Sequence, residues 1–329
     1  MHTFLTPDPI TVEIRNASGE IRVDLADVAT TTVDVVPSAG HPLGFLDDVF
    51  RAVAAKAQSV GAGRSRSESP AADTFGGADT LDDPTERVRV DLREAPEGRP
   101  GSATLIVDTD PARDGWKSAF TVHVTAPAAS GVRIQSQSAD VTITGRADRL
   151  EARTASGDTR VDEVIGRSVV QTASGDIFIA ATADCDLRTA SGSIEVESVT
   201  ADAVVHSTSG DVRLSSTTGN VNARSVSGDV RVLDATSGRT EVVTVSGDVE
   251  IGIHAGALTA VDLSTVSGST VTDFQVTDDV PAADAVAGSE DGSDGAEISF
   301  EKAAQEEPVL DLRVKTTSGN IRLRRAGAV

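Results

Sequence analysis

The sequence of 329 residues contains no tyrosine, one tryptophan and one cysteine, and aromatic residues make up only 3% of it. A conventional globular core of this size would use more large rings. The apolar content comes instead from Val, Ala, Ile and Leu, which suit a core of stacked strands. A single cysteine excludes an internal disulfide. Cys185 lies where other copies of a repeat have Ala203, Val221 and Val261, so we expect a buried thiol rather than a reactive one.

Basic residues are also scarce, with 29 Lys and Arg against 51 Asp and Glu, and the net charge is −22. Nucleic-acid binding needs a concentrated basic surface, so this composition argues against it. It argues equally against electrostatic attachment to anionic lipids. A solvated acidic surface explains the charge better than a role in collecting cations.

Long apolar runs are absent as well. No run approaches the roughly 18 apolar residues of a membrane span. The first residues, Met1–Pro7, have no basic region followed by an apolar run, so they do not read as a signal peptide. We therefore expect a cytoplasmic protein without direct membrane insertion.

Catalytic motifs are missing too. The histidines are scattered without metal-ligand spacing, and no phosphate loop, dinucleotide fingerprint or nucleophile motif follows a suitable strand. Asp and Arg recur with the repeat, whereas a catalytic site should interrupt one. The sequence therefore predicts no enzyme, no cofactor and no metal. The histidines are His2, His41, His123, His206 and His254.

What the sequence does contain is a repeated Thr-Ala-Ser-Gly-Asp-Ile/Val motif. Its serines stand at positions 156, 174, 191, 209, 227, 246 and 267, in steps of 18, 17, 18, 18, 19 and 21. Apolar residues keep even offsets on both sides of Ser-Gly, so each flank is a strand with one face inward. A second turn follows half a period later, as at Thr218-Gly219-Asn220. We predict an all-β, single-stranded, right-handed parallel β-helix (β-solenoid) with coils of about 18 residues.

The Ser-Gly-Asp triplets are predicted to form the corner of each coil. Glycine supplies a positive φ, and Ser and Asp side chains bond turn amides. Stacked carboxylates could also collect Ca²⁺. Turn chemistry is favoured because Ser193, Ser269 and Asn320 replace the Asp in other copies. The predicted turn column comprises Ser156, Gly157, Asp158, Ser174, Gly175, Asp176, Ser209, Gly210, Asp211, Ser227, Gly228, Asp229, Ser246, Gly247 and Asp248.

A second column lies three residues after each of these glycines, between two inward apolar positions. Its members are mostly charged and should face outward. We take its first members as a candidate interaction face. They are Arg160, Phe178, Glu195, Arg213 and Arg231.

The segments that interrupt the repeat complete the predicted organisation. Residues 1–36 read as N-terminal strands and a first coil, and 37–86 as an inserted amphipathic helix at 43–59 with a disordered linker. Residues 87–129 read as capping strands, helped by Trp116, and 130–329 as the solenoid with an acidic disordered insertion at 278–308. Function is expected at the interruptions, which are 43–59, 60–86 and 278–308.

The repeated Thr-Ala-Ser-Gly-Asp-Ile/Val-x-Val motif, over about 130–323 with a first copy at 14–23, resembles the toastrack-type β-strand-repeat family of bacteria. The family consists of adhesin-like domains of unknown function. The resemblance implies a single-stranded β-helix without catalytic residues. It also implies a link to envelope-stress systems with membrane partners.

These features predict a non-enzymatic scaffold or protein-interaction module, with a protein partner or self-association and no nucleic acid. One alternative is a surface or carbohydrate-binding adhesin, which would need secretion and exposed aromatic platforms. Another is a β-helix polysaccharide-active enzyme, which would need an acidic cluster outside the period.

Overall fold

The computed structural model describes residues 1–38, 88–94, 103–109, 119–274 and 309–326, and this part of the chain is all-β. The predicted helix at 43–59, Trp116 and the insertion at 278–308 lie outside the described residues. Within the described ranges, no helix is long and apolar enough to cross a membrane.

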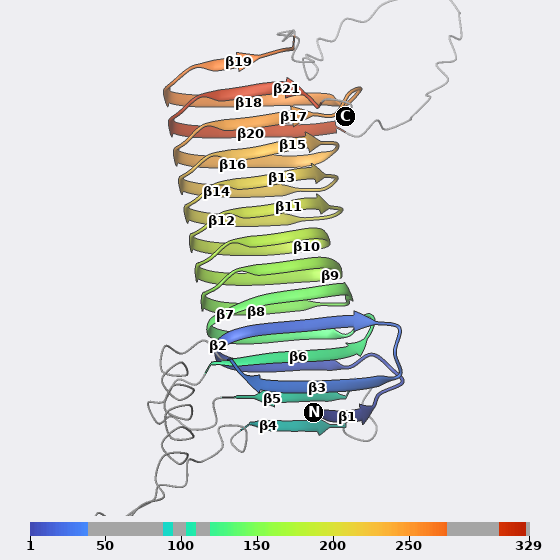
Figure 1. Ribbon diagram of the computed structural model, residues 1–329. Helices are drawn as coiled ribbons and strands as arrows, with labels where there is room; N and C mark the ends of the chain where they lie inside the picture. Colours follow the sequence, from blue (N-terminus) through green and yellow to red (C-terminus); the bar gives the residue numbers. More distant parts are fainter. Residues whose placement is uncertain (39–87, 95–102, 110–118, 275–308, 327–329) are drawn as a thin grey trace, which may run out of the picture.

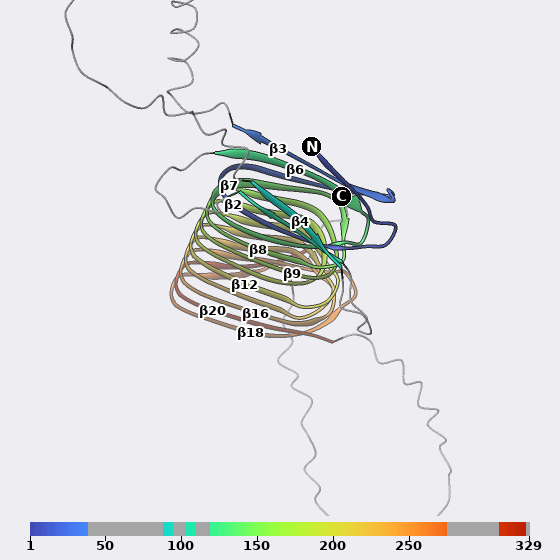
Figure 2. The same cartoon turned by 90° about the horizontal axis from the view of Figure 1, so that it is seen from below.

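Most of the strands wind into a parallel β-solenoid, seen from the side in Figure 1 and along the rod as superposed flattened loops in Figure 2. Each coil has one strand before the Ser-Gly-Asp corner and one after it, which we call its leading and trailing strands. The central coils consist of β8 (Leu150–Ser156), β9 (Thr159–Ser174), β10 (Ile177–Ser191), β11 (Ile194–Val199), β12 (Ala203–Ser209), β13 (Val212–Thr217), β14 (Val221–Ser227), β15 (Val230–Ala235), β16 (Gly238–Ser246) and β17 (Val249–Ile253).

The leading strands form one face of the rod and the trailing strands form the other. On the leading face, β8 pairs with the second half of β9, followed by the second half of β10, then β12, β14 and β16. On the trailing face, the first halves of β9 and β10 are followed by β11, β13, β15 and β17. All of these pairs are parallel, so equivalent residues of successive coils lie side by side.

This register builds the core from columns of similar side chains. Leu187 and Val205 are neighbours on the leading face, Ile179 and Val196 on the trailing face, and all four are fully buried. Burying one such side chain stabilises the fold by roughly 1.5–3 kcal/mol. Because a single coil buries its apolar side chains only against its neighbours, stability belongs to the stack.

The corner glycines are required by the closeness of that stack. Gly210 has a φ of +136°, which L side chains rarely adopt. A Cβ added to it would also overlap the carbonyl oxygen of Gly192 in the neighbouring coil. Glycine therefore serves both the backbone conformation and the spacing between coils.

At the N-terminal end, the order of coils in space differs from their order in the sequence. The strand β2 (Thr11–Ala26) pairs on one side with β5 (Thr104–Asp108) and β6 (Phe120–Pro127), and on the other with β7 (Gly131–Ala147). The first copy of the repeat is therefore the second coil of the rod. The strands β5 and β6, which we expected only to cap the solenoid, contribute a coil of their own.

The C-terminal end has a matching exchange of order. The strands β20 (Val309–Ser318) and β21 (Ile321–Arg325) insert between the β16–β17 coil and the coil formed by β18 (Leu258–Ser267) and β19 (Thr270–Thr272). Leu312 is fully buried, whereas its neighbour Val261 is 41% exposed. Thr270 and Thr272, which have the same even offsets from their corner as the buried residues of other coils, are exposed because their coil is the last one described at this end.

Antiparallel strands close the opposite end of the rod. The strand β3 (Thr30–Pro37) pairs antiparallel with β6, and β1 (His2–Leu5) pairs antiparallel with β3. Next to them, β4 (Arg89–Arg93) pairs antiparallel with β5. These strands break the parallel winding and cover an edge that would otherwise invite pairing with another chain.

The corner packing yields a direct test. We expect Gly210→Ala to lower the free energy of unfolding by more than the roughly 1–3 kcal/mol of a strained backbone, because the new Cβ also meets the carbonyl of Gly192. Gly256→Ala is the matched control, since Gly256 also has a positive φ but a Cβ added there would have no neighbour within 4 Å. Urea denaturation compares the two. An equal decrease in the free energy of unfolding for the two variants would show that the contact between corners adds nothing to the cost of the strained backbone.

Candidate functional site

The aspartates of the turn column are joined to one another along the rod by hydrogen bonds. The backbone N–H of Asp176 donates to Oδ1 of Asp158 at 2.9 Å, and that of Asp248 donates to Oδ1 of Asp229 at 2.9 Å. The carboxamide of Asn320 fills the same role by accepting from the N–H of Ser269 at 3.1 Å. Each of these side chains therefore binds the corner amide of the next coil.

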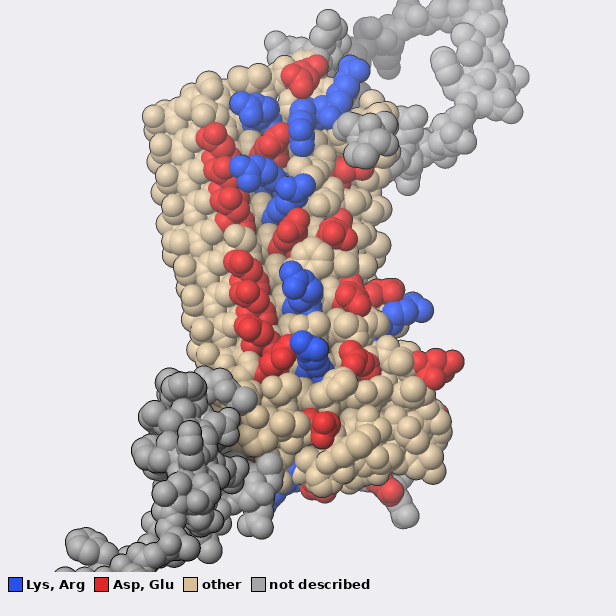
Figure 3. All heavy atoms as spheres, viewed as in Figure 1, with Lys and Arg blue, Asp and Glu red and all other residues tan. Residues whose placement is uncertain are grey.

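Acidic side chains accordingly form a nearly continuous row along one side of the rod (Figure 3). No group of three or more His, Cys, Asp or Glu residues is arranged to hold a metal ion in the part of the chain that the structure describes. The Ser and Gly members lie at the same corners. The N–H of Gly157 donates to the carbonyl of Ser174, and that of Gly210 to the carbonyl of Ser227. The arrangement holds successive corners together.

The candidate interaction face forms a contiguous column on the trailing face. Arg160, Phe178, Glu195, Arg213 and Arg231 lie on adjacent strands in register. The Arg160 guanidinium stacks over the Phe178 ring, with Cζ 5.7 Å from its centroid, and Arg213 Nε lies 3.5 Å from Glu195 Oε1. Arg231 Nη2 lies 2.7 Å from Asp229 Oδ2. The cations of this column are therefore already engaged by neighbouring side chains.

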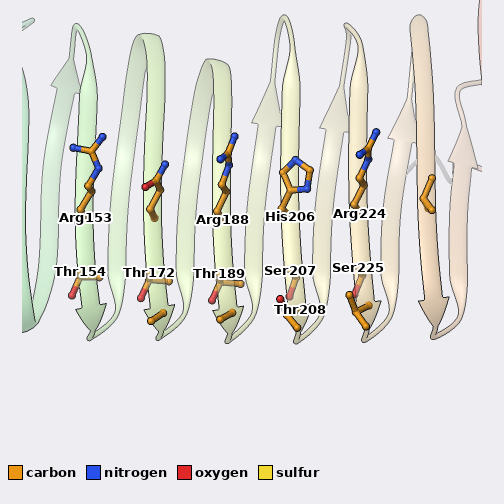
Figure 4. A pocket seen from close by; sticks show the side chains of 15 residues that line it. Arg153, Thr154, Thr172, Arg188, Thr189, His206, Ser207, Thr208, Arg224 and Ser225 are labelled. Carbon is orange, nitrogen blue, oxygen red and sulfur yellow. The ribbon is translucent and has the colours of Figure 1, made fainter.

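The leading face carries a feature that the sequence reasoning missed, a shallow groove of about 730 Å³ along the rod. One wall is a column on successive strands made of Arg153, Gln171, Arg188, His206 and Arg224, with the labelled members in a single row in Figure 4. These residues stand three positions before each corner serine. Reading that outward column from the sequence would have found them.

The remainder of the groove consists of buried or nearly buried Thr and Ser side chains and of short exposed ones. Thr154 and Thr172 are nearly buried, and their hydroxyls donate to the carbonyls of Ser156 and Ser174. Beyond them lie short side chains such as Ala173, and the 50% exposed Val226. Long side chains on one side and short ones on the other give the face its hollow.

The charged side chains that line the groove are all basic, although the protein is acidic. None of the residues that line it is Asp or Glu. Arg153 pairs with Glu151 outside the groove at 2.6 Å, and Arg188 with Asp186 at 3.0 Å. Arg224 has no ion pair with any residue that the structure describes.

The pKa of His206 reflects the positive charges of the groove. Burial lowers its pKa, and the charges of Arg188 and Arg224 lower the pKa further, against the smaller opposing effect of Asp186. An anion placed in the groove would relieve both arginine charges. The groove is therefore suited to a negatively charged ligand.

The shifted pKa values of Cys185 and Asp24 are explained by burial and by neighbouring side chains. Burial raises the pKa of Cys185 to about 12, which makes its thiol unreactive at neutral pH. His123 pairs with Asp24 at 2.6 Å, where hydrogen bonds from Thr144 and His123 lower the pKa of the carboxyl. Neither feature adjoins a cavity that could hold a substrate among those described.

Comparison with known proteins settles the family. The profile of the family described as Toastrack DUF4097 matches residues 121–324. The chain belongs to this family. The expectation drawn from the repeated motif is thus confirmed, as is the β-solenoid fold. Comparison with curated proteins finds no match.

Two solved structures share a general likeness with this toastrack chain. A "putative adhesin" from Bacteroides fragilis is 10% identical, with 98% of this chain and 95% of that chain covered and a TM-score of 0.43. A "putative cell adhesion protein" from Clostridium sporogenes is 6% identical, with 98% of each chain covered and a TM-score of 0.22. The family assignment rests on the profile match.

The hydrogen-bonded aspartates of the turn column, which we call the Asp ladder, predict different outcomes for two substitutions at one position. Asp158→Ala removes the acceptor for the N–H of Asp176 and should lower the free energy of unfolding by about 0.5–1.5 kcal/mol. Asp158→Asn should stay close to wild type, because Asn320 performs this role in its own coil. Denaturation curves with and without Ca²⁺ measure both. Stabilisation by Ca²⁺ that Asp158→Asn abolishes would support a metal site instead.

The charge of the groove predicts a change in one titration. Arg224→Gln removes a positive charge that depresses the pKa of His206, so that pKa should rise. It should remain below the ordinary value of 6.5, since burial is the larger cause. NMR titration of the His206 ring measures the change, with Arg213→Gln on the trailing face as control. An unchanged His206 pKa in Arg224→Gln would contradict a groove dominated by these guanidiniums.

Proposed function

We propose that this toastrack protein is a non-enzymatic interaction module that binds a protein partner along the groove of its leading face. The observation that carries this proposal is the absence of any carboxylate among the groove's lining residues, in a chain with a net charge of −22. The groove crosses successive coils from β8 to β16, so it offers a long contact surface on a rigid scaffold. Its wall consists of outward side chains that the core does not need.

The groove is a better candidate than the column on the trailing face. There, Arg213 and Arg231 already pair with Glu195 and Asp229. The groove differs in one cation only, because Arg153 and Arg188 are also paired, with Glu151 and Asp186. Arg224, by contrast, has no such pair with a described residue. A link to envelope stress remains a prediction of the family resemblance.

Affinity capture with matched variants tests the proposal. The groove variant carries Arg188→Ser and Arg224→Ser, and the trailing-face variant carries Arg160→Ser and Arg213→Ser. Each loses two positive charges from one outward column, so general charge effects are equal. Circular dichroism and melting temperatures establish that both fold. Lysate of the source cells is passed over each immobilised full chain at several salt concentrations.

We expect wild type and the trailing-face variant to retain the same protein, and the groove variant to lose it. Binding should weaken with salt, because exposed charges are screened. Loss of the protein from the trailing-face variant alone would move the interface to the other face. Retention of no protein by any of the three would remove the support for an interaction module.

A further inference from the structure

The cations of the groove have a regular spacing along the rod. Arg153, Arg188 and Arg224 lie on β8, β10 and β14, with Gln171 and His206 on the strands between them. Adjacent parallel strands are about 4.8 Å apart, so successive arginines start about 9.6 Å apart. A ligand that meets all three must present negative charges at this interval on one side.

The groove also restricts how a ligand can bind. The backbone groups of its strands already pair with the neighbouring coils, so a peptide cannot add to them as a further strand. The hydroxyls of Thr154 and Thr172 are directed to the carbonyls of Ser156 and Ser174. The positive charges that can recognise an anionic ligand are those of the arginine column, and short side chains line the groove beside it.

Among peptide conformations, polyproline II matches this spacing. It has three residues per turn and a rise of about 3.1 Å, so every third side chain points the same way at intervals of about 9.3 Å. In a β-strand, residues i and i+3 point to opposite faces, and residues i and i+2 are only about 6.6 Å apart. An α-helix repeats its direction after seven residues, about 10.5 Å, and is too thick for a shallow groove.

We propose that the groove binds an extended acidic peptide in the polyproline II conformation, with Asp or Glu at positions i, i+3 and i+6. The three carboxylates would pair with Arg153, Arg188 and Arg224, and the residues between them would pack on Ala173, Ala190 and Val226. Glu151 and Asp186 hold two of the arginines in place from outside the groove. This inference rests on the proposed function and names the class of its partner.

Fluorescence anisotropy with labelled synthetic peptides tests the spacing. The probe is three repeats of Glu-Pro-Pro. One control has the same composition with its three glutamates consecutive, and another has Gln in place of Glu. Asp291, Asp294 and Glu297 of the chain itself have the i, i+3, i+6 spacing. Binding is therefore measured both to wild type and to a variant with Asp291→Asn, Asp294→Asn and Glu297→Gln. Competition between this segment and the added peptide would show as tighter peptide binding to the variant.

The spaced peptide should bind about tenfold more tightly than the consecutive one, which corresponds to about 1.4 kcal/mol. The groove variant should lose at least this factor, and the trailing-face variant should stay within about twofold of wild type. Equal affinity for both acidic peptides, or equal binding by the two variants, would overturn the proposal. So would groove-dependent binding of polygalacturonate without binding of the spaced peptide.

The outcome also separates this inference from the proposed function. If capture of a protein depends on the groove while the spaced peptide shows no preference, the interaction module stands and the acidic peptide is wrong. If neither depends on the groove, both proposals fail.

Discussion

The contact between each corner glycine and the corner of the next coil is the constraint on which the rest of the rod depends. Gly175 packs on the backbone of Gly157, and Gly228 on that of Gly210, at a separation that leaves no space for a Cβ. At this separation, corner amides reach the carboxylates of neighbouring coils, as Asp176 reaches Asp158. The same spacing fixes the intervals of the outward columns. The regularity that holds the fold together therefore also sets the geometry of the groove.

At both ends of the rod, the order of the coils in space differs from their order in the sequence. Because every coil presents equivalent columns, β2 fits between β6 and β7, and β20 fits between β16 and β18. Both segments gain a neighbour on each side, although they stand first and last among the copies in the sequence. A terminal coil with a single neighbour would lose half of its burial, as the exposure of Val261 illustrates. The exchange thus gives β2 and β20 a neighbouring coil on each side, which opposes local unfolding.

The repeating unit of two strands and a corner could be predicted from the sequence, but the order of the coils in space could not. Even offsets around Ser174 and Ser209 predicted two strands and a corner, and the structure has β9 to β13 in this arrangement. No such pattern could place Ser18 beside Ser138, since either copy would match any neighbour equally well. The groove was missed because the columns around the glycine are the most regular. Its arginines recur only in alternate coils, with Gln171 and His206 between them, which hides them from a search for identical residues.

We propose that the corners provide stability and that the column three residues before them provides binding. Mapping of amide chemical shifts during titration with the spaced acidic peptide tests this division most directly. We predict that the perturbed amides cluster on the leading face, around Arg153, Arg188, His206 and Arg224. The corner aspartates and the column from Arg160 to Arg231 should remain unperturbed. Perturbations centred on the Asp ladder or on the trailing face would contradict this division of roles.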